Sequence, residues 1–176
     1  MLIHGSKQWM RLLLCAILVF AIGAMPTNAQ EKTKIAGKMT ITRPERPTLD
    51  VGDTPGHQLA MAQEKGTNSS TGEHKFMDNA EVVNLSFSDL AQGNGPHQGY
   101  MRVWQMADTV FIKWQGEVTT TLSAEKTPVT TFQGAWFYTK GTGQFQNIEG
   151  RGTFKGKFTS ETEHTVDWEG EYFIKK

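Results

Sequence analysis

Residues Gly150 to Ser160 read GRGTFKGKFTS, and glycine and phenylalanine alternate there with arginine, lysine and threonine. A period of two separates an inward face from an outward face, as in a half-buried β-strand. Residues Val166 to Ile174 (VDWEGEYFI) repeat the scheme, with valine, tryptophan, glycine and tyrosine against mainly acidic residues. Glycine inside a strand marks a kink or leaves room for a bulky neighbour or ligand. We therefore predict two strands of a closing barrel, with Gly152, Gly156 and Gly170 on its inner face.

The same alternation extends through most of the chain. It predicts further strands at Lys34 to Thr42, Ala80 to Leu90, Gly99 to Met106, Val110 to Thr121 and Pro128 to Thr139, with a weaker candidate at His57 to Glu64. The short connection Ala107 to Thr109 predicts a β-hairpin. No segment after Gln30 keeps apolar residues at helical spacing, so we predict an all-β domain with no helix longer than about three turns.

The core is expected to come mainly from the C-terminal half. Residues from Gln30 to about Gly99 are polar, with several prolines in one stretch and the tract Lys65 to Glu73 (KGTNSSTGE) in another. Such a composition buries little apolar surface by itself. Of the sixteen aromatic residues after Gln30, fourteen lie at or after Tyr100.

The segment Lys140 to Lys157 (KGTGQFQNIEGRGTFKGK) contains a G-T-G-x-F turn, and a G-x-Y strand ends the chain. In these features the chain resembles the allene oxide cyclase-like β-barrels, a group related in architecture to plant dirigent proteins and to several uncharacterised bacterial families. The resemblance implies a single antiparallel eight-stranded β-barrel with a central cavity. It transfers no catalytic residue, because none from either group matches a position here.

The first 29 residues predict an export signal. His4, Lys7 and Arg11 precede the apolar run Leu12 to Ala24, and Thr27-Asn28-Ala29 offers a cleavage site before Gln30. The run is shorter than the roughly 20 residues of a membrane-spanning helix. We therefore expect a secreted or periplasmic protein whose domain occupies residues 30 to 176, with a proline-containing irregular segment within 30 to 56. The lone Cys15 lies in the leader, so the mature chain is free of cysteine.

Composition and motifs exclude several function classes. Without its leader the chain keeps 16 basic and 18 acidic residues, a net charge of −2. This charge, spread along the chain, disfavours nucleic-acid and membrane partners. The chain has no dinucleotide-binding fingerprint and no nucleophile elbow, and its histidines lack metal-ligand spacing. We expect no cofactor, no metal and no catalytic triad.

The Asn-x-Ser pattern of N-glycosylation occurs twice, at Asn68 and at Asn84. It has a meaning only in a host that glycosylates secreted proteins. A homo-oligomer stays open, because nothing in the sequence decides it.

The candidate site is the aromatic set on the inward faces. Wide aromatics interleaved with glycine can line a cavity of the size that small ligands occupy. One charged residue is included because it lies between Tyr100 and Trp104 in an alternating strand. The candidate lining residues are Arg102, Trp114, Phe132, Trp136, Phe154, Phe158, Trp168 and Tyr172.

Three functions remain open. The first is a module that binds an apolar or aromatic small molecule in its interior. The second is a secreted structural or partner-binding module that uses its outer surface. The third is a cyclase, isomerase or dirigent-type activity, which needs a polar group inside the cavity. The third ranks last because the recognisable faces place their charges outward.

Overall fold

A computed structural model describes residues 31–44 and 46–176, so the expected export signal lies outside the described residues. The described chain forms a nine-stranded antiparallel sheet with a single short 3₁₀ helix. The elements are β1 (Thr33–Thr42), β2 (Thr48–Asp50), β3 (His57–Ser70), β4 (Glu81–Ala91), β5 (Gly95–Gln105), β6 (Asp108–Leu122), β7 (Pro128–Thr142), η1 (Gly143–Phe145), β8 (Ile148–Phe158) and β9 (Glu163–Ile174). The prediction of an all-β, antiparallel domain is confirmed.

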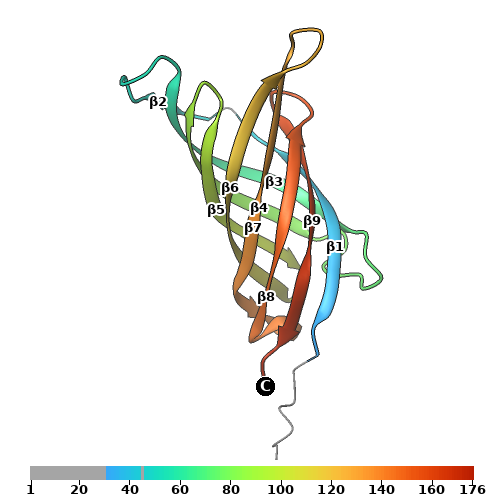
Figure 1. The fold of residues 1–176 in the computed structure, drawn as a ribbon. Helices are drawn as coiled ribbons and strands as arrows, with labels where there is room; N and C mark the ends of the chain where they lie inside the picture. Colours follow the sequence, from blue (N-terminus) through green and yellow to red (C-terminus); the bar gives the residue numbers. More distant parts are fainter. Residues whose placement is uncertain (1–30, 45) are drawn as a thin grey trace, which may run out of the picture.

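The sheet is curled until its first strand meets β3 (Figure 1). Its order is β1-β9-β8-β7-β6-β5-β4-β3-β2, and β1 also pairs with β3 from Gly37 opposite Ser70 to Thr42 opposite Lys65. Eight strands therefore surround an interior. The ninth strand, β2, pairs only with β3 and lies in the segment that was predicted to be irregular.

Glycines opposite aromatic residues shape the inner face. Five such pairs are direct cross-strand neighbours, namely Gly37 with Trp168, Gly99 with Trp114, Gly134 with Phe154, Gly152 with Trp136 and Gly156 with Phe132. A Cβ atom on any of these glycines would lie only 2.3 to 2.6 Å from a ring atom of its partner. Each ring thus lies flat over the bare backbone of the next strand. The expected inward position of Gly152, Gly156 and Gly170 is confirmed.

The polar first half contributes more than its composition predicted. Strand β3 continues through Lys65 to Ser70, and Asn68 and Ser70 are buried. Burial of these polar groups is tolerated because each is hydrogen-bonded. The Asn68 amide donates to the carbonyls of Phe76 and Met77, and the Ser70 hydroxyl donates to the carbonyl of His74.

The loop after β3 closes one end of the ring. Phe76 lies within 5.0 Å of the Phe145 ring centroid and within 5.1 Å of that of Tyr172, and it also contacts Tyr138 and Trp168. This cluster forms a packed floor beside η1, at the end of the molecule where the C-terminus lies (Figure 1).

The β5–β6 hairpin was predicted, and its turn is Met106-Ala107, since Gln105 already pairs with Asp108. On the outer face, Arg151 of β8 lies opposite Glu171 of β9, and Lys155 lies opposite Asp167. In the described part of the chain, no helix is long and apolar enough to cross a membrane.

Candidate functional site

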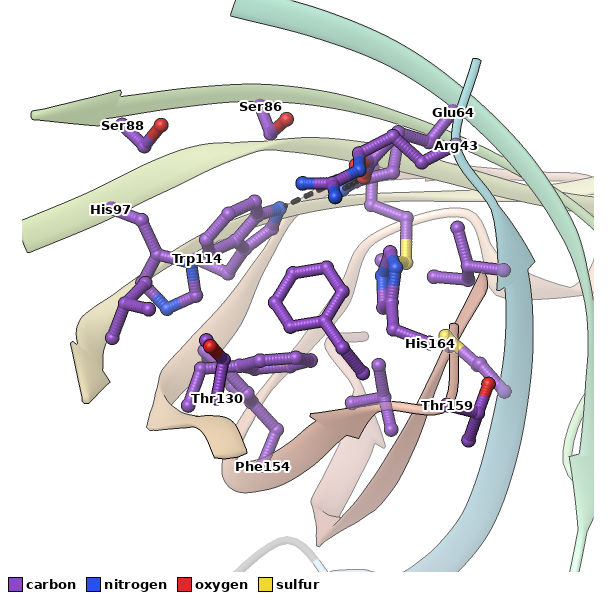
Figure 2. A pocket seen from close by; sticks show the side chains of 18 of the residues that line it. Arg43, Glu64, Ser86, Ser88, His97, Trp114, Thr130, Phe154, Thr159 and His164 are labelled. Atoms are coloured by element: carbon purple, nitrogen blue, oxygen red, sulfur yellow. Dashed lines mark hydrogen bonds between the residues drawn. The ribbon is translucent and has the colours of Figure 1, made fainter. Parts of the chain in front are cut away.

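A cavity of about 740 Å³ occupies the interior of the curled sheet. One end of the cavity, here called the mouth, is lined by residues between strands. They are Gly93 between β4 and β5, Thr127 between β6 and β7, Ser160 between β8 and β9, and Arg43 after β1. The far end of the cavity reaches the Phe76 floor. The volume falls within the range of about 300 to 1,000 Å³ that is typical of small-molecule sites. Figure 2 shows the cavity with the side chains that surround it.

One wall of the cavity is aromatic. It consists of six of the eight predicted lining residues, Trp114, Phe132, Trp136, Phe154, Phe158 and Trp168. Several of their rings meet edge to face, as in Trp114 with Phe154, whose centroids are 5.8 Å apart at an interplanar angle of 86°. Edge-to-face contacts suit the charge distribution of aromatic rings and fix their orientations. The structure therefore brings these six residues together around one space.

The other two predicted residues do not line this cavity. Arg102 is exposed, because Val103 beside it is buried in the core and the strand alternates. Its guanidinium lies 4.4 Å from the centre of the Trp104 ring. Tyr172 packs beyond the cavity against Phe76 and Phe145. The expectation that Arg102 faces inward is wrong, and Tyr172 belongs to the packed floor.

The opposite wall is polar and was not predicted. It includes Glu64 and Asn68 from β3 and Asn84, Ser86 and Ser88 from β4. The alternation in β4 was recognised, but its polar residues face inward while Leu85 of the same strand is exposed. The hydrophobic pattern alone would place Leu85 inside and the polar residues of β4 outside. The signal that could have found this wall is the run of small and polar residues at every second position of β3 and β4.

Hydrogen bonds connect the polar wall to the aromatic wall. The indole Nε1 of Trp114 donates to Asn84 Oδ1 at 2.8 Å, and Asn84 Nδ2 donates to Glu64 Oε2 at 2.6 Å. The Nε1 of Trp168 donates to Asn68 Oδ1 at 2.9 Å. Burial raises the pKa of Glu64. Both sequon asparagines are thus buried and bonded in the interior, which leaves no room for a glycan on the folded chain.

Two arginines lie at the mouth. The Nη2 of Arg43 donates to the Glu161 carbonyl at 2.9 Å, and its guanidinium lies 4.6 Å from the centre of the Phe158 ring. The Nη1 of Arg46 donates to Ser88 Oγ at 3.1 Å. Burial, followed by the nearby charge of Arg43, lowers the pKa of Arg46. The mouth thus holds two cations next to the aromatic wall.

Two histidines complete the lining. His97 and His164 both contact Phe132, and their ring centroids lie 5.6 and 5.5 Å from that of Phe132. The Nε2 of His97 and the Nδ1 of His164 are buried, and neither has a hydrogen-bond partner among the described residues. Burial lowers the pKa of each to about 4, so both imidazoles are neutral at physiological pH.

His57 lies away from the cavity lining, between Asp53 and Asp89, and the hydrogen bond to Asp89 followed by that to Asp53 raises its pKa. In residues 31–44 and 46–176, no group of three metal-ligating side chains could hold an ion. The arrangement can hold a molecule with an apolar body and at least one polar end.

No protein-family model matches the chain, and no curated protein matches it. Among solved structures, a DUF3224-family protein of unknown function from Shewanella oneidensis MR-1 is similar, with a TM-score of 0.46, 14% identity and coverage of 83% of this chain and 99% of that chain. The pterocarpan synthase dirigent protein PsPTS1 gives a TM-score of 0.45, 14% identity and coverage of 83% and 97%. The corresponding values for the dirigent protein GePTS1 are 0.43, 13%, 89% and 97%. Dirigent proteins are thus among the similar structures, and the likeness to allene oxide cyclases stays a prediction.

Proposed function

We propose that this chain is an exported barrel-type binding module that holds an apolar or aromatic small molecule in its interior. The observation that carries the proposal is the cavity of about 740 Å³ between an aromatic wall and a polar wall. Ligand sites in proteins combine a mainly apolar lining with a few fixed polar groups in this way.

The packing of the rings supports an open interior. Five of the six aromatic wall residues lie opposite a glycine of the neighbouring strand, so these rings pack against backbone where a side chain would otherwise stand. The hydrogen bonds from Trp114 and Trp168 to Asn84 and Asn68 hold two indoles in place. A binding surface that is already ordered loses little side-chain entropy when a ligand enters.

The test uses N-phenyl-1-naphthylamine, a neutral aromatic probe whose fluorescence rises in apolar surroundings. We expect saturable binding with one probe per chain. The variant Ser86→Trp adds an indole on the polar wall and fills the cavity, which should weaken binding by about tenfold or more, as a blocked apolar site does. Ser86 lines the cavity, whereas Leu85, its neighbour on the same strand, is exposed.

Leu85→Trp is therefore the matched control, because it adds the same side chain outside. It should bind the probe as the unmodified protein does. If the unmodified protein does not bind the probe, or if Ser86→Trp binds it unchanged, the interior is not the site. The outer-surface module would then be the better account of this protein.

A second candidate is acid–base chemistry of the cyclase or dirigent type. It is favoured by Glu64, which places a buried carboxyl with a raised pKa in the cavity wall. A carboxyl that titrates closer to neutral pH can donate or accept a proton during a reaction. Mass spectrometry of a compound that co-purifies with the protein, compared between the unmodified chain and Glu64→Gln, tests this role. Identical product ratios from both proteins would argue against it.

A further inference from the structure

The two mouth arginines keep most of their hydrogen-bonding capacity. A guanidinium carries five N–H donors. Among the described residues, Arg43 uses one nitrogen for the Glu161 carbonyl and Arg46 uses one for the Ser88 hydroxyl. Neither forms an ion pair with a carboxylate of the described chain. Both side chains are partly buried, and both line the cavity.

In the described part of the chain, the nearby acidic groups offset only part of the charge of this pair. Glu64 attracts both guanidiniums, but a single carboxylate offsets at most one of the two positive charges. Glu64 is buried, and its carboxyl is bonded to the amide of Asn84. Glu161 is exposed at the rim, where water screens its charge. Two guanidiniums that line the same partly buried mouth repel each other, and an anionic group placed between them would relieve that repulsion.

The cationic mouth is continuous with the aromatic wall. Phe158 lies beneath the guanidinium of Arg43, and its ring centroid is 5.6 Å from that of Phe132. A ligand with its body against Phe132 and Trp114 would thus have its outer end beside the arginines. Arginine forks match the planar oxygens of acid groups particularly well.

We infer that Arg43 and Arg46 form the subsite for an acid group, so that the ligand is an apolar or aromatic organic acid whose carboxylate or equivalent oxyanion lies at the mouth. This inference rests on the proposed function, because the arginines act on a ligand that already occupies the cavity. It adds the chemical class of that ligand and its orientation, with the acid group toward the mouth.

The test compares two probes that differ by one acid group. 1-Anilinonaphthalene-8-sulfonate carries the same N-phenylnaphthylamine body as the neutral probe, plus a sulfonate. We expect Arg46→Met to weaken binding of the sulfonate probe by about tenfold, the loss of one or two charge-assisted hydrogen bonds. The double variant Arg43→Met/Arg46→Met should weaken it further. Binding of the neutral probe should stay within about twofold in both, because the apolar wall is unchanged.

Arg102→Met is the matched control, because Arg102 is an exposed arginine on the outer face. It removes the same charge from the molecule and should leave both probes unaffected. Retained binding of the neutral probe also shows that the arginine variants are folded. If the neutral probe binds and the sulfonate probe is indifferent to both arginine substitutions, the acid subsite is refuted while the binding function stands. If the neutral probe does not bind the unmodified protein, the proposed function and this inference fail together.

Discussion

At the scale of single residues, burial beside the aromatic wall makes protonation of His97 and His164 unfavourable. Each ring packs against phenylalanine, and each has one buried nitrogen for which residues 31–44 and 46–176 supply no hydrogen-bond partner. Both pKa values are lowered to about 4, by burial for His97 and by burial together with the charges of Arg43 and His97 for His164. The folded protein therefore resists protonation of groups that the unfolded chain protonates near pH 6.5.

This difference predicts that stability falls as the pH drops from about 6.5 toward 4. The unfolded chain binds more protons than the folded chain throughout that window, so protonation favours unfolding. We expect the free energy of unfolding in urea to decrease by a few kcal/mol in total between about pH 7 and pH 4 from these two groups. The variant His164→Phe should show a shallower decrease.

The control is His74→Gln. His74 is exposed and lies outside the cavity lining, so this variant removes a histidine without changing the aromatic wall. Equal slopes for the unmodified protein and His164→Phe would show that His164 is not the neutral, buried group described above.

At the scale of the strands, the sequence predicted the strands that carry aromatic residues and the face that these residues occupy. The segments around β6 to β9 alternate apolar and polar side chains, and the structure places their aromatic faces inward. Strand β4 alternates equally well, yet Asn84 and Ser88 are buried and Leu85 is exposed. The alternation predicted the strand but not which face points inward. Polar residues can face the interior here because they are hydrogen-bonded there, as Asn84 is by Trp114.

The fit between strands predicts a sharp response to β-branched residues at the inner glycines. A Cβ on Gly156 would lie 2.3 Å from ring atoms of Phe132 and 2.5 Å from the carbonyl oxygen of Thr165. We expect Gly156→Val to lower the free energy of unfolding by about 1 to 3 kcal/mol or more, because the ring and the backbone must both move. Lys157→Val, on the outer face of the same strand, should change it by only about 0.5 kcal/mol.

Urea unfolding of the two variants decides this point. Gly156→Val as harmless as Lys157→Val would contradict the arrangement in which each ring lies over a glycine. A partial recovery in Phe132→Leu/Gly156→Val would place the strain at that ring, because the smaller side chain leaves space for the valine.

At the scale of the whole molecule, closure of the sheet creates the site. Pairing of β1 with β3 brings the polar half of the chain opposite the aromatic half, so residues such as Glu64 and Trp114 line one space. The sequence predicted the aromatic wall because period two and aromatic content agree there. For the polar wall the sequence offers only the small and polar residues at every second position of β3 and β4. For Arg43 and Arg46 it offers no signal, because their orientation depends on long-range pairing.

Export remains a prediction at this scale. The mature protein should begin at Gln30 or within a few residues of it, because Thr27-Asn28-Ala29 follows a short apolar run. N-terminal sequencing of protein recovered from the secreted or periplasmic fraction checks the cleavage site. Mature protein that retains Met1 to Ala29 would contradict the leader assignment.

The most direct test of the central claim is a crystal structure of the protein grown with 1-anilinonaphthalene-8-sulfonate. The account predicts the naphthalene inside the curled sheet against Trp114 and Phe154, with the sulfonate within hydrogen-bond distance of Arg43 or Arg46. Figure 2 shows Arg43, Trp114 and Phe154 around the space that the probe would enter. An interior filled by protein side chains, with the probe only on the outer face of the strands, would contradict it.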